Sequence, residues 1–483
     1  MIDIRPVGYV IGWLVAALGG FMLIPLFTDL HVGDRNAGAF AASAILTIMV
    51  GTVTALACSN SDREDIGVQE SFLLATGVWA VFPLFGALPF WLGEPNASFT
   101  DAFFEAMSAL TTTGATVFTG LEYMSHSVLL WRGMLQWFGG LGIVVVAMVF
   151  LPTLKVGGMQ IFRSEAFDTM GKMLPRAGEI AMSLTMIYAA LTFGCFMGYT
   201  FAGMGSFDAL VHSMTTASTG GMANQDSSFA EFNAATHYVA IIFMILSALP
   251  FVRFLQLING TAMPFFRDTQ IRTFILVLAA FVLILSIDYA LEAEEAFGES
   301  ALREVIFNIA SISTGTGYSS ADYQLWGPTA AAMFFVLGLL GGCSGSTACS
   351  AKIFRYQLMF SAVSAAVKQL HSPNRVYTPR YEGRPVSDDI LNSVMVFFMF
   401  FFLTMAVSAI LLMMIGLDPV TAVSGAATAI ANIGPGLGDE IGPAGNFSGL
   451  PAAAKWVLAT VMLIGRLELM SVFVLFTVAF WRG

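Results

Sequence analysis

Apolar segments of roughly 20 residues, long enough for a helix to cross the hydrocarbon layer of a membrane, alternate with short polar stretches along most of the chain. Charged residues make up 11% of the sequence, whereas soluble globular domains carry about 25%. The pattern therefore predicts an all-α polytopic membrane protein. The clearest spanning segments are Val7–Phe27, Ala37–Cys58, Ala181–Phe201, Thr273–Tyr289, Leu391–Leu417 and Ala452–Phe480.

Four glycine-bearing polar runs interrupt this pattern at similar intervals. They are "TTTGAT", "ASTGGM", "ISTGTGY" and "ANIGPGLGD". Aligned on one shared glycine, they place Gly114, Gly220, Gly315 and Gly434 at equivalent positions. Glycine is costly to order and hydroxyl groups compete with the backbone for hydrogen bonds, so such a run suits neither a helix nor a core strand. Self-similarity at roughly 100 residues predicts four copies of one unit.

Each polar run follows a short, mostly apolar segment of at most 14 residues, which suits a re-entrant helix better than a spanning one. One spanning segment precedes each short segment and another follows its polar run. The unit is therefore helix, re-entrant helix, polar loop and helix, and four units give eight spanning helices. Two further N-terminal helices make ten. The following helices are expected at Trp131–Leu151, His237–Leu257, Thr329–Ser350 and Ala452–Phe480. The predicted divisions are 1–66 for the extra helices, and 67–153, 154–258, 259–370 and 371–483 for the four repeats.

The distribution of basic residues predicts the orientation. With the N-terminus in the cytoplasm, 16 of the 21 Lys and Arg residues fall on the cytoplasmic side, mainly in Lys155–Arg176, Arg253–Arg272 and Lys352–Arg384. The polar runs then open toward an acidic outer face, where Glu105 is expected together with one of the few outer cations, Arg132. Acidic loops there are either simply solvated or concentrate cations at a pore mouth.

Irregular backbone at membrane depth is tolerated only where protein buries it or where it lines a water-filled cavity. Four loops meeting on one axis could replace the water shell of a monovalent cation with backbone carbonyl oxygens. A purely structural alternative is that each glycine permits close helix packing. The predicted potassium-binding selectivity filter comprises Thr112, Thr113, Gly114, Ser218, Thr219, Gly220, Ser313, Thr314, Gly315, Asn432, Ile433 and Gly434.

Two further features indicate a gate. The stretch from 338 to 352, "GLLGGCSGSTACSAK", is rich in glycine and serine. It predicts either close helix packing or, as we prefer, a break that forms a loop below the filter. Arg466 is the only Lys or Arg expected deep within a helix, where a fixed positive charge would oppose cation passage. The predicted gating residues are Gly341, Gly342, Ser344, Gly345, Ser346 and Arg466.

With its four runs and the segment "IGRLELM" at 464–470, the whole chain resembles the Trk, Ktr and HKT potassium transporter superfamily, and most closely its TrkH-type pore-forming subunits. The resemblance implies four helix–pore-loop–helix repeats in pseudo-fourfold arrangement, a gating loop, and an arginine barrier in the last helix. It also implies K⁺ as the transported ion, a homodimer in the bacterial cytoplasmic membrane, and a cytosolic RCK-type nucleotide-binding regulatory subunit.

Other readings of the sequence remain open. Asn432 and Ile433 depart from the Ser-Thr pair of the second and third runs, so an uneven filter with some Na⁺ permeation, or H⁺- or Na⁺-coupled symport, is the alternative to selective potassium uptake. A secondary transporter would be expected to carry two inverted repeats. An intramembrane enzyme would need a nucleophile with its base, and no such pair is recognisable. No organic cofactor is expected.

Overall fold

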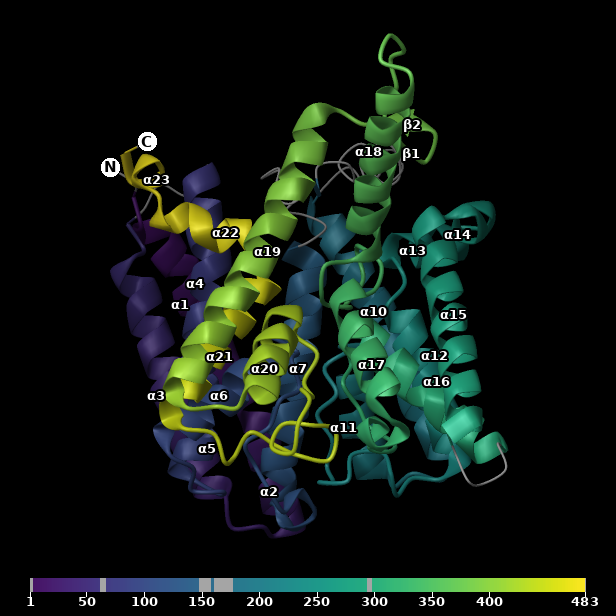
Figure 1. The fold of residues 1–483 in the computed structure, drawn as a ribbon. Coiled ribbons are helices and arrows are strands. Elements are labelled where there is room, and N and C mark those ends of the chain that lie inside the picture. The colour runs from purple at the N-terminus through teal and green to yellow at the C-terminus, as the bar shows by residue number, and fades with distance from the viewer. Residues whose placement is uncertain (1–2, 61–66, 147–157, 160–176, 293–297, 483) are drawn as a thin grey trace.

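The computed structural model describes residues 3–60, 67–146, 158–159, 177–292 and 298–482 (Figure 1). Most of the predicted basic cluster Lys155–Arg176 and the end of the segment expected at Trp131–Leu151 lie outside these residues. Helices dominate the described chain, which confirms the predicted all-α class. The elements are α1 Arg5–Phe21, α2 Leu23–Val32, α3 Ala37–Ala57, α4 Val68–Gly86, α5 Leu88–Leu92, α6 Phe99–Leu110, α7 His126–Val145, α10 Ala177–Phe201, α11 Ser206–Ala217, α12 Ala234–Ser247, α13 Phe251–Ile258, α14 Met263–Arg267, α15 Thr269–Glu292, α16 Glu299–Thr314, α17 Pro328–Leu340, α18 Ile353–His371, β1 Arg380–Tyr381, β2 Arg384–Pro385, α19 Asp388–Ile415, α20 Pro419–Ala431, α21 Ala452–Arg466, α22 Met470–Phe473 and α23 Val478–Arg482.

Seven helical segments among the described residues are long and apolar enough to cross a membrane, so the chain is a multi-pass membrane protein. Their burial differs with position. The apolar window of α15 is 17% buried inside the protein, whereas that of α7 is 72% buried. Low burial of such an apolar surface is suited to contact with lipid, while α7 lies within the protein interior. The helix α7 is therefore placed to support an internal site.

Three of the expected continuous spans are broken. The helices α12 and α13 meet at 93°, and α21 and α22 meet at 104°. Pro250 explains the first break, because it has no N–H for the helix ladder and disfavours helical backbone before it. Glu468 and Leu469 both have positive φ at the second break. The expected span Thr329–Ser350 is helical only to Leu340.

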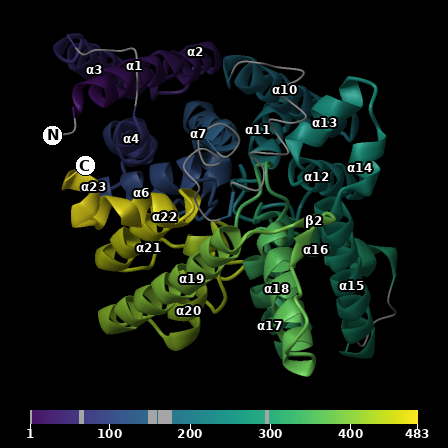
Figure 2. The ribbon, with the colours of Figure 1, turned by 90° about the horizontal axis from the view of Figure 1, so that it is seen from above.

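The four predicted re-entrant segments form the short helices α6, α11, α16 and α20. Ser98 caps α6 through its side chain, and Asp418 caps α20 in the same way. In the view from above, α6, α11 and α16 lie among the longer helices, and α20 lies beside α19 (Figure 2). Their C-terminal ends lead directly into the four polar runs. Both termini lie at the end of the molecule that carries the β1–β2 hairpin, which we call the hairpin end (Figure 1).

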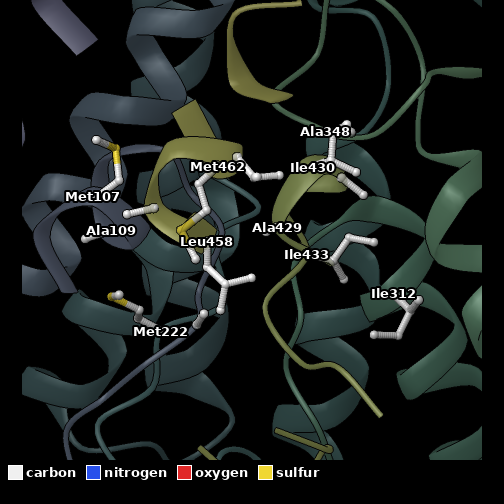
Figure 3. Close-up of a cluster of buried hydrophobic side chains, with 14 of the residues drawn as sticks. Met107, Ala109, Met222, Ile312, Ala348, Ala429, Ile430, Ile433, Leu458 and Met462 are labelled. Carbon is white, nitrogen blue, oxygen red and sulfur yellow. The ribbon is translucent and has the colours of Figure 1, made fainter. Parts of the chain in front are cut away.

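The hydrophobic core reaches the polar runs themselves. Figure 3 shows Met107 of α6, Leu458 and Met462 of α21, and Ile312 of α16 in one buried cluster with Ile433. A Cβ atom added to Gly338 would lie 2.8 Å from Cδ1 of Ile433, so α17 packs closely against this side chain. The fourth run is thus anchored in the core by an apolar side chain.

Candidate functional site

Backbone hydrogen bonds show which residues of the four runs are equivalent. In each run, one backbone N–H group donates to the carbonyl group five residues earlier, over 2.9 to 3.1 Å. The four donors are the N–H groups of Thr113, Gly220, Thr316 and Ile433. The residue before each has positive φ, and so does the glycine after it. We call these segments the central triplets: Thr112–Gly114, Thr219–Gly221, Gly315–Gly317 and Asn432–Gly434.

This register corrects the alignment on shared glycines at two of the four runs. Gly114 and Gly434 are equivalent as predicted, but their partners are Gly221 and Gly317 rather than Gly220 and Gly315. Ser313 and Thr314 belong to the last turn of α16, and Ser218 is the C-cap residue of α11. The second and third runs each contain two glycines.

The central triplets contact one another in chain order and close a ring. A Cβ atom built on Gly114 would collide with the carbonyl oxygen of Gly220, and one on Gly434 would lie 2.8 Å from that of Thr113. In the same way, Gly221 faces the carbonyl oxygen of Thr316 and Gly317 faces that of Ile433. Each glycine therefore admits a carbonyl of the neighbouring triplet, at a φ that side chains rarely adopt.

The ring is closer to twofold than to fourfold in its side chains. Thr111 and Thr113 share a hydrogen bond of 2.8 Å between their hydroxyl groups, and Thr314 and Thr316 repeat it at 2.7 Å. The other two triplets have no such threonine pair. In one, Gln136 Nε2 of α7 donates to Gly220 O (2.6 Å). In the other, Asn432 Nδ2 donates to Thr113 Oγ1 (2.9 Å) and to Met462 O (3.0 Å).

Each short helix also holds the segment that leaves its triplet. Glu105 Oε2 accepts from Val117 N at 2.9 Å, and Asn308 Oδ1 accepts from Ser320 N at 3.2 Å. Ser424 Oγ accepts from Leu437 N at 2.9 Å. In the second repeat two side chains do this work, because Asn224 Nδ2 donates to Asp208 Oδ1 at 2.8 Å. These bonds fix the exits of all four triplets.

Glu105 and Arg132 form a buried ion pair at this level, with 2.8 Å between Oε1 and Nε. The guanidinium group also donates to Ala223 O (2.9 Å) and to Thr116 Oγ1 (3.2 Å), so it joins the exits of the first and second triplets. Both side chains are expected on the outer face, and in the structure they are buried rather than solvated. Their 27-residue separation gave no signal of the pairing.

A cavity of about 220 Å³ lies on the exit side of the ring. Its lining includes one glycine from every central triplet, together with Arg132. Polar groups such as Thr116, Asp226 and Ser319 form other parts of its wall. All four glycines thus face one space, which we call the vestibule.

On the other side of the ring, the segment Gly341–Lys352 forms a loop between α17 and α18, in agreement with the predicted break. Gly341 ends α17 with φ of 73°. The loop is bonded to the α12–α13 bend. Cys343 N donates to Ala248 O (3.1 Å), and Phe251 N donates to Gly345 O (2.9 Å). It also reaches the ring, because a Cβ atom on Gly315 would lie 3.1 Å from Cβ of Cys349.

Arg466 lies between this loop and α7. Its Nη1 donates to Cys349 Sγ (2.6 Å), and its Nη2 lies 3.4 Å from Gly139 O. Glu468 does not pair with Arg466 but with Lys352, at 3.4 Å, and with Arg355. The sequence predicts Arg466 as the only Lys or Arg deep within a helix, whereas Lys352 and Arg355 are also buried. Two cationic side chains therefore pair with one carboxylate beside the loop, and Arg466 contacts the loop separately.

Comparison with known proteins agrees with this architecture. A profile of the TrkH family, described as a cation transport protein, matches residues 37–481. The chain belongs to the TrkH family. It is 42% identical to the Trk system potassium uptake protein TrkI of Halomonas elongata over 474 residues, covering 97% of this chain and 95% of that protein.

Two further relatives extend the match to nearly the whole chain. The Trk system potassium uptake protein TrkH of Escherichia coli K12 is 34% identical over 483 residues, which covers 99% of each chain. The crystal structure of the potassium transporter TrkH from Vibrio parahaemolyticus superposes with a TM-score of 0.91 at 31% identity, and 100% of both chains is covered. The predicted family and all-α membrane fold are confirmed.

Proposed function

We propose that this chain takes up potassium ions across a bacterial cytoplasmic membrane through the ring of central triplets, which acts as a selectivity filter. The observation that carries the proposal is the closed ring of contacts between neighbouring triplets. In this ring, one carbonyl group of each triplet faces a glycine of its neighbour, and the four carbonyls are those of Thr113, Gly220, Thr316 and Ile433. Neutral carbonyl oxygens can replace the water shell of a weakly hydrated monovalent cation. The C-terminal ends of four short helices point at the same place and add negative dipole potential there. The relatives named as potassium uptake proteins support K⁺ as the ion.

The loop Gly341–Lys352 is proposed as the gate below this filter. It contains the predicted gating residues Gly341, Gly342, Ser344, Gly345 and Ser346, and it contacts both the ring and Arg466. The cationic excess of Arg466, Lys352 and Arg355 over Glu468 opposes a cation in the closed state. Movement of the loop away from Gly315 would open the path.

The assembly belongs to the same proposal. The chain works as a homodimer with one path in each subunit, joined to a cytosolic RCK-type regulatory subunit at the hairpin end. This end carries Lys368, Arg375, Arg380 and Arg384, which agrees with a cytoplasmic N-terminus under the positive-inside rule. Transport by relatives of this family supports a role as a transporter rather than as an enzyme.

The second candidate is a weakly selective Na⁺/K⁺ path. The second and fourth triplets have Gly220 and Ile433 where the first and third have a paired threonine. Gln136 also occupies one lone pair of the Gly220 carbonyl. Uneven ligand strength around the ring would lower discrimination between the two ions. The observation is compatible with either ion being conducted, and only selectivity separates the two candidates.

The test uses cells that lack their own potassium uptake systems. The wild-type chain should restore growth at low K⁺ and drive Rb⁺ uptake that K⁺ inhibits more strongly than Na⁺ does. Gly317→Ala should abolish this uptake, because the added methyl group meets the Ile433 carbonyl. Gly449→Ala is the matched control, since no atom of the described residues lies within 4 Å of its added Cβ. A well-expressed wild-type protein that never restores growth would refute the proposal, and equal inhibition by Na⁺ would favour the second candidate.

A further inference from the structure

The helices α13 and α14 form an exposed elbow, residues 251–267, at the rim of the molecule (Figure 2). The 93° bend at the end of α12 turns α13 sideways. A ring contact between Phe254 and Phe265, with centroids 5.7 Å apart, holds α14 against α13. The elbow therefore has a defined shape rather than being an extended loop.

The outer surface of the elbow is apolar. Leu257, Ile258, Met263 and Phe266 are 42%, 72%, 61% and 65% exposed. Four large apolar side chains on two adjoining short helices form a surface that water solvates poorly. A turn of this kind at the edge of a membrane protein is suited to insertion among lipid headgroups.

Basic side chains border the same surface. Arg267 ends α14 and Arg272 lies in the first turn of α15, and both are exposed. Arg272 donates its Nε–H to Phe266 O (2.9 Å), which leaves its other N–H groups for a ligand. The nearby carboxylates are otherwise engaged. Asp268 pairs with Arg253 at 2.6 Å, and Glu382 accepts from Thr269 Oγ1 at 3.0 Å.

The depth of the elbow follows from α15. Beyond Arg272, its exposed side chains become apolar at once, beginning with Ile275 (43% exposed) and Leu276 (69%). This change marks the boundary between headgroups and hydrocarbon on α15. Arg267 and Arg272 thus lie at headgroup level, with the exposed apolar residues of the elbow beside them.

The elbow is also bonded to the loop Gly341–Lys352. Phe251 N, the first residue of α13, donates to Gly345 O (2.9 Å). Just beyond its other end, Asp268, which pairs with Arg253 of the elbow, accepts from Gln270 N through Oδ1 (2.8 Å), and Gln270 Oε1 accepts from Ser344 N (2.9 Å). A displacement of the elbow must therefore move this loop or break one of these bonds.

We propose that the elbow binds the headgroup of an acidic phospholipid through Arg267 and Arg272, and that this binding holds the loop Gly341–Lys352 in position. The choice of lipid over a protein partner rests on the juxtaposition of exposed apolar side chains, cationic groups and the lipid-facing surface of α15. Attraction between anionic headgroups and two guanidinium groups supplies the specificity. The effect on transport rests on the proposed function, whereas lipid binding does not.

The test compares wild-type protein with the double variant Arg267→Gln/Arg272→Gln in native mass spectrometry and in vesicles. The vesicles contain phosphatidylcholine alone or phosphatidylcholine with added phosphatidylglycerol. Retention of phosphatidylglycerol should weaken about fivefold for each arginine removed. Rb⁺ flux through the wild type should change when phosphatidylglycerol is added, and flux through the double variant should not. Phe266→Ser should weaken retention by removing apolar contact.

The matched control variant, Arg375→Gln/Arg384→Gln, removes an equal charge from the hairpin end. Unchanged phosphatidylglycerol retention in the double variant would overturn the proposal. The proposal would also be overturned if the double variant retained phosphatidylglycerol normally but no longer responded to a cytosolic protein partner. The elbow would then be a contact surface for a protein. If flux is absent in every vesicle but the arginine-dependent retention is seen, the proposed transport function fails and the lipid site stands.

Discussion

Glu105 and Arg132 form a buried ion pair on the vestibule side of the ring of central triplets. The corresponding helix in the third repeat uses the neutral Asn308 for the same bond to the exit segment. A charge is therefore not needed to hold an exit segment. What the pair adds is the link from Arg132 to Ala223 O, which joins two repeats. At the scale of single residues, the pair is a brace between the first and second exits.

Glu105→Gln tests this brace. The amide oxygen can still accept from Val117 N, but Arg132 loses its counter-charge while remaining buried. Removing one partner of a buried pair costs about 3 to 5 kcal/mol. Thermal unfolding of the purified protein should show a large loss of stability. The double variant Glu105→Gln/Arg132→Met should recover much of the loss, because no unpaired charge remains. A double variant no more stable than the single one would contradict this account.

At the scale of elements, the bends are as informative as the helices. Each lies where a long apolar segment reaches the loop Gly341–Lys352. Ser247 and Ala248, at the end of α12, accept bonds from the loop, and Arg466, at the end of α21, donates to it. A straight helix would have satisfied the backbone carbonyl groups of Ser247 and Ala248 internally, whereas Arg466 donates through its side chain. The breaks thus release polar groups that hold the loop in place.

The start of α20 permits a prediction about pH. Asp418 Oδ2 accepts from Val420 N (2.9 Å) and Thr421 N (3.0 Å). Hydrogen bonds from the Thr421 side chain and backbone lower the pKa of Asp418 in the folded protein. Because the folded pKa lies below that of the unfolded chain, the carboxylate adds stability above the unfolded pKa. This contribution is lost as pH falls through the folded pKa.

Asp418→Ala should therefore destabilise the protein by ~1 kcal/mol near neutral pH, the usual cost of removing an N-cap. The difference from wild type should shrink as the solution is acidified. Asp418→Asn is the control, because the amide also caps helices but does not titrate in this range. Thermal unfolding measured across a pH series gives both comparisons. A difference between wild type and Asp418→Ala that is independent of pH would show that the carboxylate charge has no part in the cap.

At the scale of the whole molecule, the sequence could predict the short helices, the place of the polar runs and the membrane spans, although not the breaks in three of those spans. Each of these follows from composition within a local window. It could not fix the register of the second and third triplets, because Gly220 and Gly221, like Gly315 and Gly317, are equally good glycines. It also could not pair Lys352 with Glu468, which lies far away along the chain. Such pairings depend on packing between repeats, which no local pattern records.

The two sides of the ring also differ in how easily a reagent in solution can reach them. The vestibule meets all four triplet glycines, whereas Cys349 is buried on the opposite side, between Gly315 and Arg466. If the loop Gly341–Lys352 is the gate, a thiol reagent reaches Cys349 only when the loop moves. Arg466→Gln removes a charged hydrogen-bond donor from the closed position. Losing such a bond should increase the open population by roughly tenfold or more.

The measurement uses 2-aminoethyl methanethiosulfonate added at the hairpin end, in a Cys58→Ser background that removes the half-buried thiol. Mass spectrometry should find Cys349 labelled faster in Arg466→Gln than in the parent, and Rb⁺ flux should fall as labelling proceeds. Cys349→Ala identifies any flux change that comes from other thiols. Equal labelling rates with and without Arg466 would mean that this side chain does not hold the loop. The barrier to cations would then be purely electrostatic, because the loop would stay in place while the positive charge alone opposed the ion.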